Sequence, residues 1–277
     1  MRPCSREGRR DRGGCGDRGK RGRGDDGARA AGRDAVALIR IEGAVKRYGA
    51  AVALDGVSLS VAPGDCLGLV GESGSGKTTL LRAINRLTDL DAGRVLVRGD
   101  PVESLDPVRL RRSIGYVQQD GGLIPHWTCL ANASLVPGLL GREEAREHGR
   151  RALDAAGLDP DTFADRYPRE LSGGQRQRVA IARAIAAGPD ILLMDEPFGA
   201  LDAITRREAQ KTFIQLRRAG GVTAVFVTHD LAEAMLVATD VAVMRAGRVA
   251  FQAPAEELAG SATGYAAELL EKAGVAV

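Results

Sequence analysis

Residues 71–78, Gly-Glu-Ser-Gly-Ser-Gly-Lys-Thr, constrain the fold of this chain more than any other segment. Two glycines with four residues between them, followed by Lys-Thr, have the spacing of a loop that binds nucleotide phosphate. An apolar run from Cys66 to Val70 precedes the loop and predicts a buried strand, and residues 79–84 after it predict a helix. This strand–loop–helix order is the context that the spacing requires, so the sequence predicts a nucleotide site here.

The predicted loop carries the groups that hold a triphosphate. Its glycines permit a tight turn and bring backbone N–H groups close to the β- and γ-phosphates, and the helix that begins near Lys77 adds its positive dipole end. We expect Lys77 to reach the phosphate oxygens and the Thr78 hydroxyl to coordinate Mg²⁺. The alternative is a glycine-rich loop that matches the spacing by chance. The predicted nucleotide-binding residues of the loop are Gly71, Glu72, Ser73, Gly74, Ser75, Gly76, Lys77, Thr78 and Thr79.

A second segment places acidic groups at the end of a predicted strand. Residues 191–194 are apolar, and Asp195 and Glu196 follow them directly. A buried strand would bring Asp195 to its carboxyl edge, where it can hold the Mg²⁺ shell. Glu196 is then placed to polarise an attacking water as a general base. Two solvated carboxylates at a strand end are the alternative.

Strands and helices alternate along the chain. The sequence predicts further strands at residues 36–41, 52–61, 94–98 and 224–227, and helices at residues 143–156 and 175–187. This alternation predicts an α/β fold with a mainly parallel sheet that is covered on both faces. The stretch between residues 120 and 187 has helical character, and we expect it to form a separate lobe.

Composition limits the kinds of protein that this chain can be. Hydrophobic residues make up 44% of it, which is ample for a core. No apolar run reaches the roughly 18 residues that cross a bilayer. The cysteines Cys4, Cys15, Cys66 and Cys129 form no CxxC pair and no cluster with histidine, which is typical of reduced thiols in the cytosol.

The formal charge of +3 belongs to the amino-terminal tail. Residues 1–34 hold eleven Lys/Arg and six Asp/Glu, whereas the remaining residues hold 28 basic and 30 acidic groups. A near-neutral body argues against a nucleic-acid-binding protein, so we expect no nucleic-acid partner. Because the tail is poor in large apolar residues, residues 1–35 are expected to be a disordered Arg/Gly-rich extension, or the product of a start codon assigned too early. A contact with RNA or with anionic lipid is the functional alternative.

One more segment, Leu171-Ser172-Gly173-Gly174-Gln175, follows about a hundred residues after the loop. Together the two segments resemble the ATP-binding subunits of ABC transporters, and the resemblance covers residues 37 to about 260. It implies an α/β fold, a P-loop NTPase core of the ABC type, with an antiparallel β part near the N-terminus and an inserted α-helical subdomain. The ATPase domain is expected at residues 36–277, with its core at 36–120 and 187–277 and the helical subdomain at 121–186.

The resemblance implies that the nucleotide site is shared between subunits. In this family the signature of one subunit closes over the γ-phosphate held by another. The implied signature contacts of this chain are Ser172, Gly173, Gly174 and Gln175. Because the chain has one phosphate loop and one signature, the implied partner is a second ATP-binding subunit, most simply a copy of itself. ATP and Mg²⁺ are the implied ligands.

Two further residues take roles from the resemblance. Tyr48 occupies the position of the aromatic residue that stacks on adenine, and a structural tyrosine is the alternative. Gln119 lies three residues after Tyr116, as the family's glutamine does, and would contact Mg²⁺ and the attacking water. Gln118 offers the other register, and fills a position that is usually apolar or aromatic.

The remaining residues of the implied site follow Asp195 and Glu196 in the chain. Asp202 ends the run Ala200-Leu201-Asp202, which resembles the D-loop that couples the two sites. His229 follows a predicted strand, as the switch histidine does, and would hydrogen-bond the γ-phosphate; a structural histidine is the alternative. The implied catalytic residues are Glu196, His229, Gln119 and Lys77. The implied metal-binding residues are Thr78, Gln119 and Asp195, the last through water.

Residues 122–128, Gly-Leu-Ile-Pro-His-Trp-Thr, and residues 196–206 resemble a narrower branch, the ATPases of osmoprotectant importers. This implies an ATP-hydrolysing subunit, peripheral on the cytoplasmic face of the membrane, that energises uptake of solutes such as glycine betaine, choline or proline. Its implied partners are transmembrane permease subunits and, indirectly, an extracytoplasmic binding protein. Importers of amino acids, methionine or alkyl sulfonates are the alternative, followed by a soluble ABC ATPase without a transport role. Many members of the branch carry a regulatory domain after the ATPase, and we expect none here.

Overall fold

The computed structural model describes residues 37–199 and 201–274. The predicted disordered tail, the predicted strand residue Val36 and the D-loop residue Ala200 lie outside the described residues.

A four-stranded antiparallel sheet forms the amino-terminal part. Its strand order is β2-β1-β4-β5, and the strands are β1 (Ile39–Tyr48), β2 (Ala51–Val61), β4 (Ala92–Val97) and β5 (Asp100–Pro101). The first strand extends well beyond the predicted residue 41 because β1 pairs along its length with β2 and, on its other edge, with β4. The antiparallel part expected near the N-terminus is therefore confirmed.

A six-stranded sheet forms the centre of the molecule, in the order β10-β9-β3-β8-β7-β6. All neighbouring strands run parallel except β10, which pairs antiparallel with β9. The strands are β3 (Cys66–Val70), β6 (Ile114–Val117), β7 (Ile191–Asp195), β8 (Thr223–Thr228), β9 (Asp240–Arg245) and β10 (Arg248–Pro254). Every residue of β3, β7 and β8 is buried, as expected for strands covered on both faces. The predicted mainly parallel sheet is confirmed.

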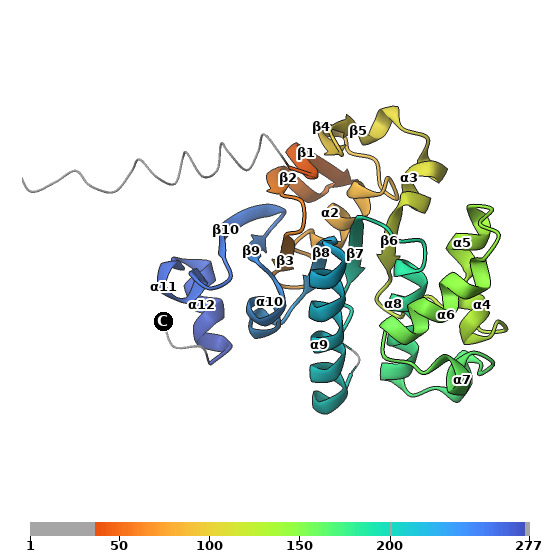
Figure 1. The fold of residues 1–277 in the computed structure, drawn as a ribbon. Coiled ribbons are helices and arrows are strands. Elements are labelled where there is room, and N and C mark those ends of the chain that lie inside the picture. Colours follow the sequence, from red (N-terminus) through yellow and green to blue (C-terminus); the bar gives the residue numbers. More distant parts are fainter. Residues whose placement is uncertain (1–36, 200, 275–277) are drawn as a thin grey trace, which may run out of the picture.

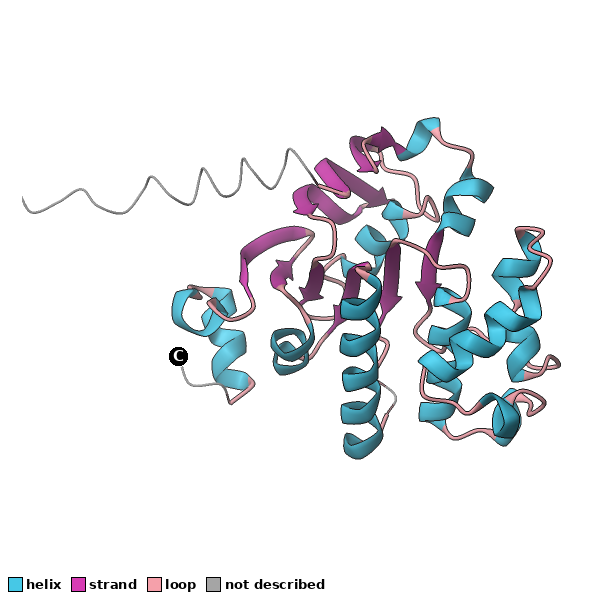
Figure 2. Ribbon diagram, in the orientation of Figure 1, coloured by secondary structure: helices cyan, strands magenta, loops and turns pink. Residues whose placement is uncertain are grey.

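Side chains of the central strands alternate between two hydrophobic clusters. In β3, Cys66 and Val70 join a cluster with helices α8 (Gly173–Ile185), α9 (Ala203–Gly220) and α10 (Leu231–Val237). Leu67 and Leu69 join a cluster with helix α2 (Lys77–Ile84) and the antiparallel sheet. Figure 2 shows the resulting layers, with the sheet between these elements. This arrangement brings the carboxyl ends of β3, β7 and β8 to one edge of the sheet, where loops carry the predicted site residues.

The helices differ from the predicted ranges by a few residues at their ends. The predicted helix 175–187 begins earlier, at Gly173, because Ser172 caps it, and the predicted helix 143–156 spans Ala145–Ala155. The α-helices are α2 (Lys77–Ile84), α3 (Pro107–Ser113), α4 (Cys129–Ala133), α5 (Leu135–Leu139), α6 (Ala145–Ala155), α7 (Pro160–Phe163), α8 (Gly173–Ile185), α9 (Ala203–Gly220), α10 (Leu231–Val237), α11 (Leu258–Ser261) and α12 (Tyr265–Lys272). Short 3₁₀ turns lie at η1 (Val102–Ser104) and η2 (Pro168–Glu170).

Helices α4 to α8 gather beside the sheets (Figure 1). They pack around a hydrophobic cluster of their own, which includes Leu130, Leu153, Leu158, Leu171 and Val179. The division into a core and a helical subdomain stays a prediction, and this separate cluster supports it.

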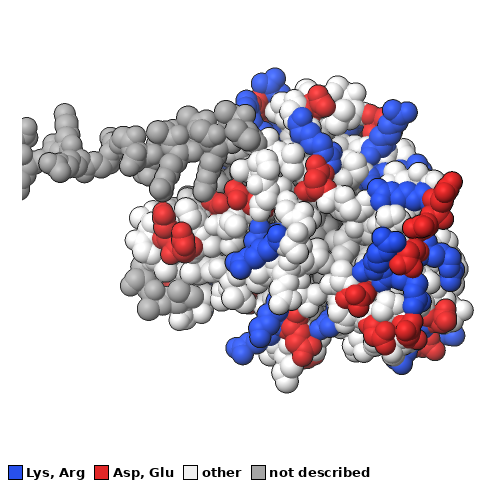
Figure 3. Space-filling model, in the orientation of Figure 1, with Lys and Arg blue, Asp and Glu red and all other residues white. Residues whose placement is uncertain are grey.

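Among residues 37–199 and 201–274, no helix combines the length and apolar character that crossing a bilayer requires. On the face drawn in Figure 3, basic and acidic side chains are interspersed rather than separated by sign.

Candidate functional site

The phosphate loop joins the end of β3 to the start of α2, as predicted. Two of its glycines have positive φ and lie against other backbone segments: Gly71 (φ +156°) and Gly76 (φ +102°). A Cβ atom would lie 2.2 Å from the Met244 carbonyl oxygen at Gly71, and 2.3 Å from the Ala53 carbonyl oxygen at Gly76. Because a side chain at either position would collide with backbone, only glycine gives this loop its shape.

The turn between β9 and β10 braces the loop from behind. The Gly247 N–H donates to the Ser75 carbonyl oxygen at 3.1 Å, and the Gly247 carbonyl oxygen accepts from the Asp55 N–H at 2.9 Å. The Arg248 Nε donates to Asp55 Oδ2 at 2.8 Å. This support has no local signal in the sequence, because the turn lies about 170 residues after the loop.

Lys77 lies under the loop and is 6% exposed. Its Nζ donates to the carbonyl oxygens of Gly71 (2.7 Å) and Glu72 (2.8 Å) and contacts Ser75 Oγ at 3.3 Å. Burial lowers the pKa of the Lys77 ammonium, while the nearby carboxylates of Glu196 and Asp195 raise it. A buried ammonium at the loop that joins β3 to α2 suits the phosphate contact predicted for this residue.

Thr78 and Asp195, two of the three residues predicted to bind Mg²⁺, contact each other. The Thr78 hydroxyl donates to Asp195 Oδ1 at 3.0 Å, and Asp195 is 3% exposed at the end of β7. Burial raises the pKa of the Asp195 carboxyl, and the Thr78 hydrogen bond opposes that rise. The described residues hold no group of three or more His, Cys, Asp or Glu side chains suited to a metal. A hydroxyl and one carboxylate fit Mg²⁺, which usually takes few protein ligands together with water and phosphate oxygens.

Glu196, Gln119 and His229 converge from the ends of different strands. The Glu196 N–H donates to the Val227 carbonyl oxygen at 3.0 Å, and its φ is +46°. Its Oε2 accepts from Gln119 Nε2 at 3.1 Å and lies 3.7 Å from His229 Nδ1. The structure therefore brings three of the four predicted catalytic residues together around one carboxylate.

Of the two adjacent glutamines, Gln119 is the one that reaches Glu196. A Cβ atom at Gly122 would lie 2.6 Å from Gln118 Oε1, so Gln118 faces its own turn. This supports the register in which Gln119 is the site residue. The predicted contact of Gln119 with Mg²⁺ stays a prediction, because its hydrogen bond goes to Glu196 and not to Thr78 or Asp195.

The signature residues begin α8 with a reciprocal cap. Ser172 Oγ accepts from the Gln175 N–H at 3.2 Å, and Gln175 Oε1 accepts from the Ser172 N–H at 3.0 Å. Gly174 is buried against α9, where a Cβ atom would lie 2.0 Å from Thr205 Cγ2. The two hydrogen bonds between Ser172 and Gln175 join signature residues to each other. Their predicted contact with nucleotide stays a prediction.

The two remaining predicted residues occupy different environments. Tyr48 ends β1 with 54% of its surface exposed, and Lys46 Nζ lies 5.5 Å from the centre of its ring. Asp202 caps α9, accepting from the N–H groups of Ile204 (3.1 Å) and Thr205 (3.0 Å). The hydrogen bond from the Thr205 hydroxyl lowers the pKa of the Asp202 carboxyl, and the backbone N–H donors add to this effect. Tyr48 thus has an exposed ring beside a lysine ammonium, and its predicted contact with adenine stays a prediction, whereas Asp202 acts locally as a helix cap.

Comparisons with known proteins agree with this geometry. Residues 54–199 match the family model described as ABC transporter. The glycine betaine/carnitine/choline transport ATP-binding protein OpuCA of Bacillus subtilis is 43% identical over 85% of this chain and 63% of its own length. The sulfate/thiosulfate import ATP-binding protein CysA of Bradyrhizobium diazoefficiens is 46% identical over 76% of this chain and 62% of its own length.

Solved structures of ATP-binding cassettes are also similar to this chain. A dimeric structure of the ATP-binding cassette MJ0796, bound to ADP and Pi, is 34% identical and has a TM-score of 0.72, covering 79% of this chain and 99% of that one. The chain spans 54–63% of the length of the first curated relatives that it matches.

Proposed function

The chain belongs to the ABC transporter family and carries its ATP-binding domain, and we propose that it hydrolyses ATP to energise an importer of osmoprotectants. The observation that carries the proposal is the convergence of Gln119 and His229 on the Glu196 carboxylate, at the same sheet edge as the phosphate loop. This arrangement suits hydrolysis of a bound triphosphate better than storage of a nucleotide, because it supplies a base beside the phosphate site.

Each group has a separate task in the proposed reaction. Lys77 and the backbone N–H groups of the loop bind and orient the β- and γ-phosphates. Glu196 accepts a proton from the attacking water, while Gln119 and His229 hold the carboxylate and the water in line. Thr78 and Asp195 would hold Mg²⁺, which neutralises charge on the phosphate oxygens when bound.

A second copy of the chain completes the proposed site. In the proposed pair, the positive dipole end of α8, which begins at Gly173, faces a phosphate held by the other subunit. The dimeric MJ0796 cassette, 34% identical to this chain, supports such a pairing. ATP binding would close the pair and hydrolysis would reopen it, moving permease subunits at the cytoplasmic face of the membrane.

The proposed solute class rests on relatives rather than on this site, because the solute need not touch the ATPase. OpuCA of Bacillus subtilis is named for transport of glycine betaine, carnitine and choline. A second candidate class is sulfate or thiosulfate, since CysA of Bradyrhizobium diazoefficiens matches at 46% identity.

Solute uptake in cells tests the proposal. A strain lacking the gene is complemented with the wild-type chain or with Glu196→Gln, and uptake of labelled glycine betaine, choline, carnitine and sulfate is measured at high osmolarity. Uptake of quaternary amines restored by the wild type alone is the expected result. Restoration of sulfate uptake alone would replace the solute class, and equal uptake with both variants would remove the link between hydrolysis and transport.

A further inference from the structure

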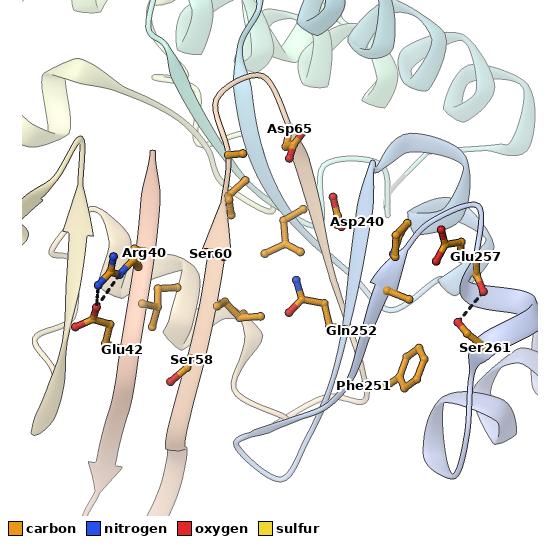
Figure 4. A pocket seen from close by; sticks show the side chains of 17 residues that line it. Arg40, Glu42, Ser58, Ser60, Asp65, Asp240, Phe251, Gln252, Glu257 and Ser261 are labelled. Atoms are coloured by element: carbon orange, nitrogen blue, oxygen red, sulfur yellow. Dashed lines mark hydrogen bonds and ion pairs between the residues drawn. The ribbon is translucent and has the colours of Figure 1, made fainter. Parts of the chain in front are cut away.

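A groove of about 800 Å³ lies between β1 and β2 on one side and β10 and α11 on the other (Figure 4). At its wall, Glu42 accepts hydrogen bonds from the Nε atoms of both Arg40 and Arg94, so this carboxylate is already paired. None of the predicted nucleotide-site residues lines the groove. A charged side chain on α8, Arg183, does reach a loop of the nucleotide site, and it has no task in the reaction described above.

The chain turns sharply at Gln119, just after β6. The Gly121 N–H donates to the Gln118 carbonyl oxygen at 2.9 Å, and Gly121 and Gly122 have φ of +71° and +56°. Two successive residues in the left-handed region continue neither a strand nor a right-handed helix. Regular secondary structure therefore supplies no partner for the carbonyl oxygens of this turn, and they accept hydrogen bonds from a side chain of another element.

Arg183 supplies these hydrogen bonds from α8. Its Nη1 donates to the Gly122 carbonyl oxygen at 2.6 Å, and its Nη2 donates to the Gly121 carbonyl oxygen at 2.7 Å. Burial lowers the pKa of the Arg183 guanidinium, so the two carbonyl oxygens replace water that the group has lost. A planar fork of N–H donors suits two successive carbonyl oxygens, whereas a lysine ammonium is a point charge on a flexible stem.

Helix α8 also packs directly on the strand and the turn that carry the site glutamine. A Cβ atom at Gly121 would lie 3.4 Å from Ala180 Cβ, which is ordinary van der Waals contact. At Gly115 in β6, a Cβ atom would lie 2.6 Å from the Ala184 carbonyl oxygen, so strand and helix approach closely. Ala180, Arg183 and Ala184 are three and four positions apart and share one face of α8. The site glutamine therefore lies between two points at which the chain is fixed to one helix.

We propose that Arg183 is a positioning residue for Gln119, holding its turn on α8 so that the side-chain amide stays at the Glu196 carboxylate. Gln119 Nε2 donates to Glu196 Oε2 at 3.1 Å, which joins the turn after β6 to the residue that follows β7. Release of Gly121 and Gly122 lets the turn relax, and a small displacement of an aligned group costs much of its catalytic effect. The inference rests on the proposed function, because Gln119 has this task only in ATP hydrolysis.

A double-mutant cycle in the full chain tests this role. Phosphate release from ATP is measured for the wild type, Arg183→Lys, Gln119→Ala and the double variant, and gives kcat and KM for each. Arg183→Lys keeps the charge but loses the bidentate contact, so we expect kcat to fall about tenfold while KM for ATP stays within about twofold. In the Gln119→Ala background the same substitution should change kcat less than about twofold, because the group that Arg183 positions is gone.

Arg178→Lys is the matched control on the same helix. Arg178 Nη1 also donates to a glycine carbonyl oxygen, that of Gly157, at 3.2 Å, and Gly157 is not a residue of the nucleotide site. This variant should keep both kcat and KM within about twofold of the wild type. Arg183→Gln is carried through the same cycle as a second variant, and urea unfolding shows whether each variant is folded.

With a wild type that hydrolyses ATP, an unchanged kcat in Arg183→Lys overturns the proposal. So does a loss of kcat that is equal with and without the Gln119 side chain, because Arg183 would then act through another group. Unfolding of both Arg183→Lys and Arg183→Gln in buffer also overturns it, since the guanidinium would then hold the fold. A folded wild type that releases no phosphate would instead remove the proposed function, and this role with it.

Discussion

Glu196 has an uncommon backbone conformation, and its carboxylate contacts two other side chains. Its φ of +46° lies in the left-handed region, which costs a non-glycine residue about 1–2 kcal/mol. The hydrogen bond from its N–H to Val227 and the fully buried Phe198 just after it hold this conformation. Strain of this kind is tolerated where it serves a site, and here it accompanies the contacts with Gln119 and His229.

Replacing this carboxylate should separate ATP binding from hydrolysis. Glu196→Gln keeps the shape of the side chain but removes the base, so we expect phosphate release to fall about 10²–10⁴-fold. Nucleotide affinity should stay within about twofold of the wild type, because the phosphate contacts are unchanged. Phosphate release and equilibrium nucleotide binding measure the two effects, with Glu143→Gln in an exposed loop as the control. Hydrolysis at the wild-type rate would remove Glu196 from the role of base.

The sequence predicted which residues form the phosphate loop but not what holds them. Gly71 and Gly76 could be identified from spacing alone, because the loop needs glycine wherever backbone approaches backbone. The atoms that enforce this, the carbonyl oxygens of Met244 and Ala53, belong to other strands. Their positions depend on tertiary packing, which no local pattern contains.

Helices α8 and α9 meet where the signature begins. Gly174 leaves space for the Thr205 methyl group, which would lie 2.0 Å from a Cβ atom. The glycine was predicted as a nucleotide contact from its place in a motif. Its packing role could not be foreseen, because the sequence does not reveal which face of α9 lies opposite.

This contact predicts a specific rescue. Gly174→Ala should lower the free energy of unfolding by about 1–3 kcal/mol through overpacking, despite the better helix propensity of alanine. Adding Thr205→Ser removes the Cγ2 methyl and keeps the hydroxyl that bonds Asp202, so most of the loss should be recovered. Urea unfolding of the single and double variants checks both steps. A double variant no more stable than Gly174→Ala would argue against this contact.

An ion pair links the antiparallel sheet to the parallel one. Arg98, after β4, donates through Nε to Asp190 Oδ2 at 2.8 Å, just before β7. The Arg98 guanidinium lowers the pKa of the Asp190 carboxyl more than burial raises it. Its contribution to stability is therefore complete above the ordinary carboxyl pKa and disappears as pH falls through the lowered value.

Removing this pair should have a pH-dependent effect. Asp190→Asn is expected to lower the free energy of unfolding by about 0.5–1 kcal/mol at pH 7, since both partners are partly exposed. The difference from the wild type should shrink towards zero at acid pH, where the wild-type carboxyl is protonated. Denaturant unfolding at several pH values measures this. A difference that is constant with pH would contradict the ion-pair explanation.

The alternation of strands and helices along the chain predicted a mainly parallel sheet covered on both faces, as the central sheet is. The β9–β10 hairpin and the helices after it were not predicted, because their short apolar runs fit either a strand or a helix. The second subunit proposed to close over the signature also lies beyond what one chain's sequence or structure contains.

A shared site makes hydrolysis depend on concentration. If two chains complete each site, the specific ATPase activity of the purified protein should fall about tenfold for each tenfold dilution once monomers dominate. Sedimentation at the same concentrations gives the fraction of dimer for comparison. Constant specific activity in samples that are fully monomeric would show that one chain suffices.

The sheet order also governs when the nucleotide site can exist during synthesis. β3, which ends at the phosphate loop, lies between β8 and β9, and both are made more than 150 residues later. At about 5–20 residues per second, the ribosome exposes β3 for on the order of ten seconds before either neighbour emerges. Its backbone N–H and C=O groups then have no strand to pair with, a condition that favours aggregation. The nucleotide site is therefore completed late, only after β8 and β9 have joined β3.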